Sequence, residues 1–220
     1  MVGDRLRIGA LVTHTEIEDS ELVAKHAPLL RAAAPHIAHR AIRNLGTWGG
    51  SLAYGDPAAE WPACSLALQA TMVIHGPAGE RKISAKDFFI DLYTTALEPD
   101  EILVATEIPL ATSNQVFYFH ELARRHGDYA VAGLAAVAQK DGKVLNNCAF
   151  TFFSVSSTPV MATAAQDIVN GKILNAEVIA EAVNAAREEI EAIADITNSA
   201  EAKRHLIGVL LERGIKHLVA

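Results

Sequence analysis

The chain has 220 residues, of which 50% are apolar, so it can bury one large hydrophobic core or two small ones. Its formal net charge is −7 and its basic residues are scattered, which excludes nucleic-acid binding through a basic patch. No apolar run has the length of a membrane span, and the first residues lack the pattern of a signal peptide.

The two cysteines, Cys64 and Cys148, lie in different predicted elements and do not form a C-x-x-C motif. This pattern favours a reducing, cytoplasmic compartment over a disulfide framework. Two thiols are also too few to hold an iron–sulfur cluster. None of the nine histidines shows metal-ligand spacing, so no metal site is predicted in this chain.

The first half of the chain alternates short helices and strands. Thr15 and Glu18 have capping-box spacing, and Pro28 is expected in the first turn of a helix. Phe88 and Phe89 are expected to fill the core beside a short helix. The other elements are predicted in this order: a strand at 6–12, a glycine-rich loop at 46–51, a helix at 62–70, and strands at 71–75, 81–83 and 102–108.

The second half has long strands followed by helices. Residues 111–114 are polar and lack periodicity, so we place a boundary there, between a domain of residues 1–111 and a domain of residues 112–220. Asp141-Gly142 predicts a hairpin turn. Strands are predicted at 116–121, 129–139 and 143–154, and helices at 163–169, 176–194 and 199–218. Strands that precede helices in this way indicate an α+β fold.

The glycine-rich segment is the first candidate site. Gly49 and Gly50 allow a backbone to press against a ligand, and their amides can form an anion-binding concavity. The hydroxyls of Thr47 and Ser51 add neutral donors for a phosphate oxygen. The segment lacks the lysine of a P-loop and the spacing of G-x-G-x-x-G, so an ordinary glycine turn remains an alternative.

Other charged residues have simpler interpretations when taken alone. Asp56 and Glu60 read as solvated loop charges, and Asp128 as the counter-ion of Arg124 or Arg125. No serine, cysteine or histidine is paired in the pattern of a nucleophile and its base, so no catalytic residue is assigned.

Four segments in a fixed order carry a resemblance to a known family. They read IGALVTHTEI, RNLGTWGGSLAYGDPAAEWPA, EPDEILVATEIP and ARRHGDYAVAGLAAVA. Together they resemble the FAD-binding medium subunit of the molybdenum hydroxylases, the family of carbon monoxide dehydrogenase and xanthine dehydrogenase. The resemblance extends from residue 6 to about residue 218. It implies part of a PCMH-type FAD-binding domain, followed by an α+β domain in which a three-stranded antiparallel sheet packs on a helical bundle.

The resemblance also implies roles for individual residues. Four positions match the segment that lies against the FAD pyrophosphate: Thr47, Gly49, Gly50 and Ser51. Five positions match contacts of the ribityl chain or the flavin ring: Glu60, Ile102, Leu103, Asp128 and Tyr129. His120 stands near a place where relatives can carry a lysine. Trp48 departs from the usual aliphatic residue, and either packs under the glycine segment or obstructs the ligand side.

The function that the resemblance implies is electron transfer. Electrons from a substrate oxidised at a large molybdopterin subunit would pass through the iron–sulfur centres of a small subunit to FAD in this chain. The flavin would then reduce an external acceptor such as NAD or a quinone. Two alternatives stay open. One is a cofactor-free assembly or scaffold subunit, and the other is a vanillyl-alcohol-oxidase-like flavoprotein that acts directly on a substrate.

One departure from the family pattern concerns the start of the chain. Family members carry a further N-terminal lobe with an A-G-G-x-S motif that also clasps the pyrophosphate, and here Met1 shortly precedes the IGAL strand. Three outcomes stay open: the chain is apo, it binds FAD weakly, or another chain completes the site. We expect the isolated chain to show no stoichiometric flavin.

Overall fold

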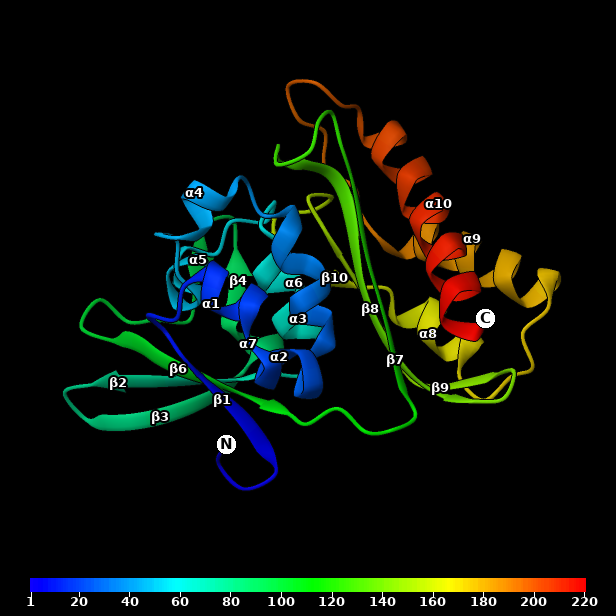
Figure 1. The fold of residues 1–220 in the computed structure, drawn as a ribbon. Coiled ribbons are helices and arrows are strands. Elements are labelled where there is room, and N and C mark those ends of the chain that lie inside the picture. Colours follow the sequence, from blue (N-terminus) through cyan, green and yellow to red (C-terminus); the bar gives the residue numbers. More distant parts are fainter.

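A computed structural model describes residues 1–220 (Figure 1). The first half contains β1 (Arg5–Gly9), α1 (His14–Asp19), α2 (Glu21–His26), α3 (Pro28–Ala33), the 3-10 helix η1 (Ala34–His36), α4 (Arg40–Arg43), α5 (Trp48–Tyr54), α6 (Glu60–Ala67), β2 (Thr71–Gly76), β3 (Gly79–Ser84), α7 (Ala85–Phe88), β4 (Phe89–Asp91), β5 (Thr94–Thr95) and β6 (Ile102–Pro109). The second half contains β7 (Gln115–Ala123), β8 (Ala130–Asp141), β9 (Val144–Phe153), β10 (Val160–Met161), α8 (Thr163–Val169), α9 (Ala176–Glu189) and α10 (Ala200–Val219). No helix combines the length and the apolar character needed to cross a membrane.

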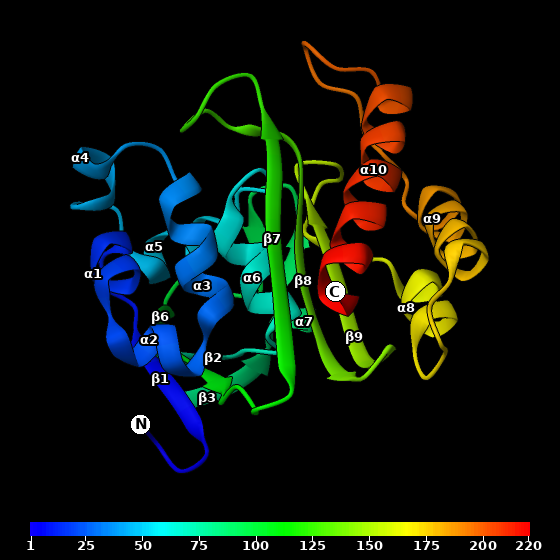
Figure 2. The same ribbon diagram turned by 45° about the vertical axis from the view of Figure 1, so that its right-hand side comes forward.

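Two antiparallel sheets organise the chain. The first has the strand order β1-β6-β2-β3, and the second has the order β10-β9-β8-β7. The second sheet therefore has the three expected long strands and a two-residue fourth strand, β10. It stands between the helices of the first half and the layer formed by α8, α9 and α10 (Figures 1 and 2).

Alternation along β8 explains why both faces of the second sheet are covered. Leu134 and Ala136 face the C-terminal helices, whereas Ala135 and Val137 belong to the core of the first half. Side chains of successive strand residues point to opposite faces, so one run of small apolar residues serves two cores. Helices α3 and α6 pack on the face of the second sheet that is turned towards the first half of the chain.

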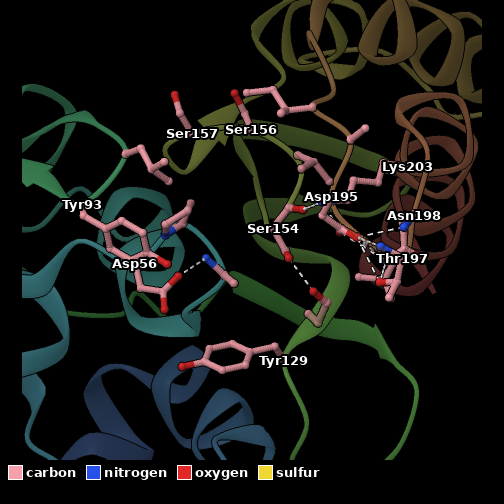
Figure 3. Close-up of a pocket in the computed structure, with 18 of the residues that line it drawn as sticks. Asp56, Tyr93, Tyr129, Ser154, Ser156, Ser157, Asp195, Thr197, Asn198 and Lys203 are labelled. Carbon is pink, nitrogen blue, oxygen red and sulfur yellow. Dashed lines mark hydrogen bonds and ion pairs between the residues drawn. The ribbon is translucent and has the colours of Figure 1, made fainter.

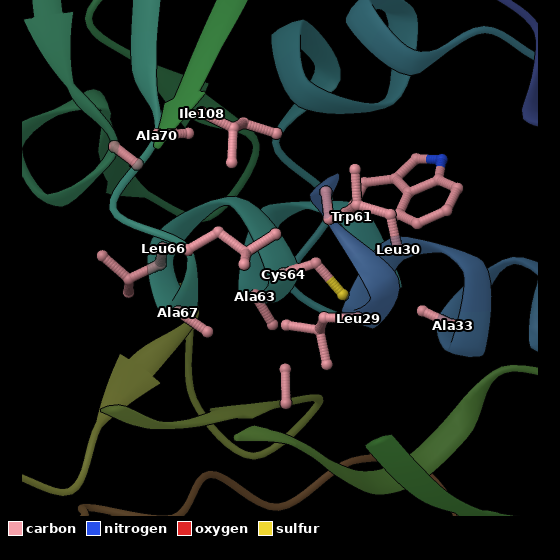
Figure 4. Packing of buried hydrophobic residues seen from close by; sticks show 14 of the residues in the cluster. Leu29, Leu30, Ala33, Trp61, Ala63, Cys64, Leu66, Ala67, Ala70 and Ile108 are labelled. Carbon is pink, nitrogen blue, oxygen red and sulfur yellow. The ribbon is translucent and has the colours of Figure 1, made fainter. Parts of the chain in front are cut away.

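The core of the first half continues into the second half. Phe119 of β7 stacks on Phe153 of β9 with ring centroids 5.7 Å apart, and both belong to the N-terminal cluster. Cys64 of α6 is fully buried and lies against Leu29 and Leu30 of α3 (Figure 4). This shared packing fixes the N-terminal helices against the second sheet.

Two local features lie at other positions along the sequence than predicted. The capping box of α1 uses Thr13 and Glu16, while the hydroxyl of Thr15 donates to Asn44. Capping depends on where the backbone turns into the helix, and two threonines with a glutamate three positions on offer the same spacing. Helix α6 begins at Glu60, two residues before the predicted start, and ends at Ala67.

The β8–β9 hairpin is also displaced by one residue. Asp141 pairs with Val144, so the two turn residues are Gly142 and Lys143. Gly142 has φ +58°, a left-handed conformation that favours glycine. Pro28 occupies the first turn of α3 as predicted, and Phe88 is fully buried at the end of the short helix α7.

Candidate functional site

Four of the nine predicted site residues line one cavity of about 250 Å³. Ser51 comes from α5, Glu60 is the first residue of α6, and Asp128 and Tyr129 come from the β7–β8 connection. The fold thus brings together residues that are far apart in the sequence. Tyr129 is 68% exposed as a residue, so its side chain is open to a ligand.

The glycine segment is the first turn of a helix, and the prediction of a loop there was wrong. Thr47 caps α5, because its hydroxyl accepts a hydrogen bond from the amide of Gly50. The amide of Trp48 donates to the carbonyl of Val12, and the amide of Gly49 donates to the carbonyl of Ala10, both at a distance of 2.8 Å. The amide of Ser51 donates to the carbonyl of Thr47. These four amides therefore have partners within the chain and do not form an open anion-binding concavity.

Packing explains why position 49 is a glycine. A Cβ at Gly49 would lie 2.3 Å from the Cβ of Ala10, closer than two carbon atoms can approach. Helix α5 is thereby held against the segment that follows β1. Trp48 is fully buried, its indole N–H donates to the hydroxyl of Thr106 over 2.9 Å, and its ring meets Trp61 edge-on. Trp48 therefore packs under the helix and leaves the ligand side free.

The outer surface of α5 is accessible to a ligand. Gly50 is exposed, and a Cβ placed there would meet no neighbour within 4 Å except the Thr47 hydroxyl. Ile102, at the start of β6, is 63% exposed, whereas Leu103 is 7% exposed and belongs to the core. Neither Ile102 nor Leu103 lines the cavity that holds Tyr129.

Glu60 occupies an unusual electrostatic environment. Burial, and then the negative charges of Glu121 and Asp56, raise the pKa of Glu60 to about 8. Asp56 is itself 8% exposed, and its carboxylate accepts a hydrogen bond from the amide of Ala58. The pKa of Glu60 therefore lies well above that of a solvated loop carboxylate.

Glu121 of β7, whose negative charge acts on the pKa of Glu60, was not identified from the sequence. Its side chain is 4% exposed, and Oε1 lies 3.5 Å from Nδ1 of His36. Its second oxygen, Oε2, is buried and has no hydrogen-bond partner. The only signal in the sequence was an acidic residue at an inward-facing position of a strand, and it became informative once the fold placed His36 beside it.

His14 is a second residue that the sequence did not reveal. It lines the same cavity, and its Nδ1 accepts a hydrogen bond from the indole of Trp61 over 2.9 Å. Burial, and then the charge of Arg43, lower the pKa of His14 to about 4. The neutral ring therefore carries its proton on Nε2 and offers one donor.

The two adjacent arginines form ion pairs with the same carboxylate. Arg124 and Arg125 lie 3.4 Å and 3.5 Å from Oδ2 of Asp128. Asp128 is thus the counter-ion of both, where a pairing with only one of them was expected. His120 is half-buried on β7, and burial, followed by the charge of His36, lowers its pKa.

A second cavity, of about 390 Å³, adjoins the first one. Tyr129 and Asp56 line both cavities. Tyr93 and Asp56 lie on one side of the second cavity, with Asp195 and Lys203 on the other (Figure 3). The Lys203 ammonium is buried and binds the Ser154 carbonyl at 2.7 Å and the Asp195 carboxylate at 2.8 Å.

The residues around these cavities fit a flavin dinucleotide by their chemistry. Glu60 and Ser51 supply acceptors and donors for hydroxyl groups, and the exposed ring of Tyr129 supplies an aromatic face. Outside the two cavities, Gly50 presents backbone without a side chain, and Ile102 exposes an apolar surface. The contact with a pyrophosphate group would use hydroxyls and the helix surface, because the amides of Trp48 to Ser51 are already bonded.

Two family models together match most of the chain. The FAD binding domain in molybdopterin dehydrogenase matches residues 1–111, and the CO dehydrogenase flavoprotein C-terminal domain matches residues 117–218.

Individual relatives match over nearly the whole chain. The nicotine 6-hydroxylase medium subunit of Paenarthrobacter nicotinovorans is 38% identical over 97% of this chain and 75% of its own length. The carbon monoxide dehydrogenase medium chain of Hydrogenophaga pseudoflava is 32% identical over 97% of this chain and 74% of its own.

Solved structures show the same fold. Carbon monoxide dehydrogenase from Hydrogenophaga pseudoflava superimposes with a TM-score of 0.95 at 33% identity, covering 98% of this chain and 75% of that one. Quinoline 2-oxidoreductase from Pseudomonas putida 86 superimposes with a TM-score of 0.93 at 36% identity, covering 100% and 76%.

Proposed function

The chain belongs to the FAD-binding medium subunits of the molybdenum hydroxylases, a family of oxidoreductase complexes, and we propose that it passes electrons through FAD to an external acceptor. The observation that carries this proposal is the convergence of Ser51, Glu60 and Tyr129 on one cavity. These residues come from three separate segments of a chain whose first half matches an FAD-binding domain.

We assign the cofactor contacts to the surface that these residues form. Thr47, Gly49, Gly50 and Ser51 would support the pyrophosphate from α5, with Gly49 acting through its packing on Ala10. A set of five further residues would contact the rest of the cofactor: Glu60, Ile102, Leu103, Asp128 and Tyr129. Leu103 would act only from beneath, because it is buried in the core.

Bound FAD supplies a centre that accepts electrons singly or in pairs, which suits a connection between iron–sulfur centres and a two-electron acceptor. The chain's own residues bind and orient it. The neutral His14 ring offers a donor at Nε2, and Glu60, with its raised pKa, lies in the same cavity. The exposed side chain of Tyr129 would supply an aromatic face for the cofactor.

The partners we propose are an iron–sulfur small subunit and a molybdopterin large subunit, with NAD or a quinone as the external acceptor. Carbon monoxide dehydrogenase and nicotine 6-hydroxylase relatives are named as medium subunits, which supports such an assembly. A division into residues 1–111 and 112–220 and a cytoplasmic location also remain proposals. The two free, buried cysteines are consistent with a reducing compartment.

The test is the flavin content of the assembled complex. We expect stoichiometric FAD in a complex purified with its small and large subunits. In that complex, substrate should bleach the flavin absorbance, and an added acceptor should restore it. A complex with intact iron–sulfur and molybdenum centres but no flavin would reject the proposal and favour the cofactor-free scaffold.

A further inference from the structure

Helices α9 and α10 pack against each other and leave a cavity of about 270 Å³ between them (Figure 2). Its wall on α9 is apolar where Ile179 and Val183 lie. Three charged side chains also line it: Arg187 of α9, and Glu212 and Lys216 of α10. None of its lining residues belongs to the cofactor cavity or to the cavity beside it.

The guanidinium of Arg187 rests on the backbone of Gly208 in α10. A Cβ at Gly208 would lie 2.1 Å from Nε and 2.4 Å from Cζ of Arg187, so a larger residue there would displace the guanidinium. Glycine in the interior of a helix lowers the stability of that helix. The close approach of Arg187 to α10 is therefore a specific feature of this helix pair.

Arg187 has hydrogen-bonding capacity that the fold leaves unused. Its Nε is buried and has no hydrogen-bond partner. Glu212 is the one acidic residue that lines the cavity, but its Oε1 lies 2.5 Å from Nζ of Lys216. The hydrogen bond from Lys216 is the main cause of the lowered pKa of Glu212, and Arg187 contributes through its charge alone. A buried donor without an acceptor is destabilising, so its acceptor is to be sought outside the chain.

The chemistry of the lining residues defines the ligand. A guanidinium presents its N–H groups as a planar fork that matches the two oxygens of a carboxylate. Two cations and one anion line the cavity, so a ligand with a single negative charge balances them. Ile179 and Val183 suit a hydrocarbon body. Sites for drug-sized ligands measure about 300–1,000 Å³, so the ligand that fits here is a small one.

We propose that the cavity between α9 and α10 binds the carboxylate of a small organic acid with an apolar body, and that Arg187 is its anchor. The carboxylate would accept hydrogen bonds from Nε and a terminal nitrogen of Arg187, which gives the buried donor its partner. Lys216 would add a second positive charge. This site goes beyond the proposed electron transfer and does not depend on it, because it shares no residue with the cofactor cavity.

The first test uses benzoate as the probe. Nitrogen-15 NMR of the full chain should show a saturable shift of the Nε–Hε signal of Arg187, which is assigned by its loss in Arg187→Lys. Benzamide has the same shape without the charge and should leave the signal in place. Inorganic phosphate lacks the apolar body and should bind at least about tenfold more weakly than benzoate. Equal affinity for benzoate and either control compound would overturn the proposal.

The second test measures the affinity for benzoate in variants by calorimetry. Arg187→Lys keeps the charge but loses the fork, and should weaken binding by at least about tenfold. Glu212→Gln removes the anion from the cavity and should tighten binding by about threefold. The matched control is Arg204→Met, which changes an exposed residue of α10 outside the cavity. Unchanged affinity in an Arg187→Lys variant with a native circular dichroism spectrum would overturn the proposal.

A third measurement distinguishes an external ligand from an internal partner. If the Glu212 carboxylate turned from Lys216 to Arg187 in solution, Glu212→Gln would move the Nε–Hε signal of Arg187 with no ligand present. We expect that signal to stay in place in Glu212→Gln and to move when benzoate is added. A shift in the unliganded variant as large as the one benzoate causes in the wild type would show that Glu212 is the partner, and would overturn the proposal.

Discussion

The indole N–H of Trp61 donates a hydrogen bond to Nδ1 of His14 across 2.9 Å, and the two rings meet edge-on. Trp61 is fully buried on α6, and His14 begins α1. A neutral imidazole that accepts at Nδ1 must carry its proton on Nε2. This bond therefore fixes the tautomer of a residue that lines the cofactor cavity.

His14 makes the stability of the protein depend on pH. Its pKa falls from 6.5 to about 4 on folding, so the unfolded chain binds a proton more readily than the native chain between these values. Stability is therefore fully present above pH 6.5 and decreases as the pH falls towards 4, by about 3 kcal/mol from this residue. Urea unfolding at a series of pH values measures the slope.

The variant His14→Gln isolates that contribution. Glutamine can still accept from Trp61 but does not titrate, so the decline in stability between pH 6.5 and 4 should become shallower than in the wild type. His205→Gln serves as the control, because His205 is an exposed residue of α10. Equal slopes in His14→Gln and the wild type would show that His14 titrates normally.

Glu60 should act on stability with the opposite sign. Its folded pKa of about 8 lies above its ordinary value of 4.5, so its protonated form is favoured in the native state. Stability is present below pH 4.5 and is lost as the pH rises through 8, by up to about 5 kcal/mol. Glu60→Gln cannot ionise. It should match the wild type in acid and exceed it above pH 8, as thermal unfolding would show.

Two adjacent glycines should respond differently to the same substitution. Gly49→Ala places a methyl group 2.3 Å from Ala10, so α5 must move and the protein should lose about 1–3 kcal/mol of stability. Gly50→Ala meets only the mobile Thr47 hydroxyl at 2.7 Å, and a better helix former offsets the weakened cap. Unfolding curves should separate the two, while FAD titration of the complex should show weaker binding for Gly50→Ala.

Lys203 should fix the segment on the far side of the second cavity. Lys203→Met leaves the Ser154 carbonyl without its donor and removes the partner of Asp195. We expect a loss of about 1–3 kcal/mol and faster hydrogen exchange around residues 191–198. Lys216→Met removes an exposed pair with Glu212 and should change stability by no more than about 0.5 kcal/mol. Equal losses in the two variants would contradict the buried role of Lys203.

The sequence predicted those elements whose signal is local. Alternation identified β8 and β9, and the helical period identified α8, α9 and α10, because each period depends on residues a few positions apart. The start of α1 was misplaced because Thr13 and Thr15 both have capping-box spacing. The glycine segment was taken for a loop because two glycines disfavour helix, whereas tertiary contacts with Ala10 and Val12 hold α5 in place.

The candidate site was harder to predict because it depends on contacts between distant segments. Ser51, Glu60 and Tyr129 were named by resemblance, and the fold placed them in one cavity. His14 and Glu121 carried no motif. His14 is held beside the site by its hydrogen bond from Trp61, and Glu121 lies beside His36 of η1. Free amides at Gly49 and Gly50 were predicted from residue type alone, and backbone pairing had already used them.

Tyr129 gives the sharpest test of the cofactor surface. Tyr129 is 68% exposed as a residue and lines both cavities, so its side chain is open to a ligand. Tyr129→Ala should weaken FAD binding by up to about tenfold, since a stacked aromatic pair contributes about 0.5–1.5 kcal/mol, and it should restore flavin fluorescence. Tyr129→Phe keeps the ring and should bind as the wild type does. Ile173→Ala, at a similarly exposed position between α8 and α9, should change neither quantity.

If Tyr129→Ala retained full affinity and full quenching, the flavin ring would have to lie elsewhere, and the exposed surface at Ile102 would become the stronger candidate.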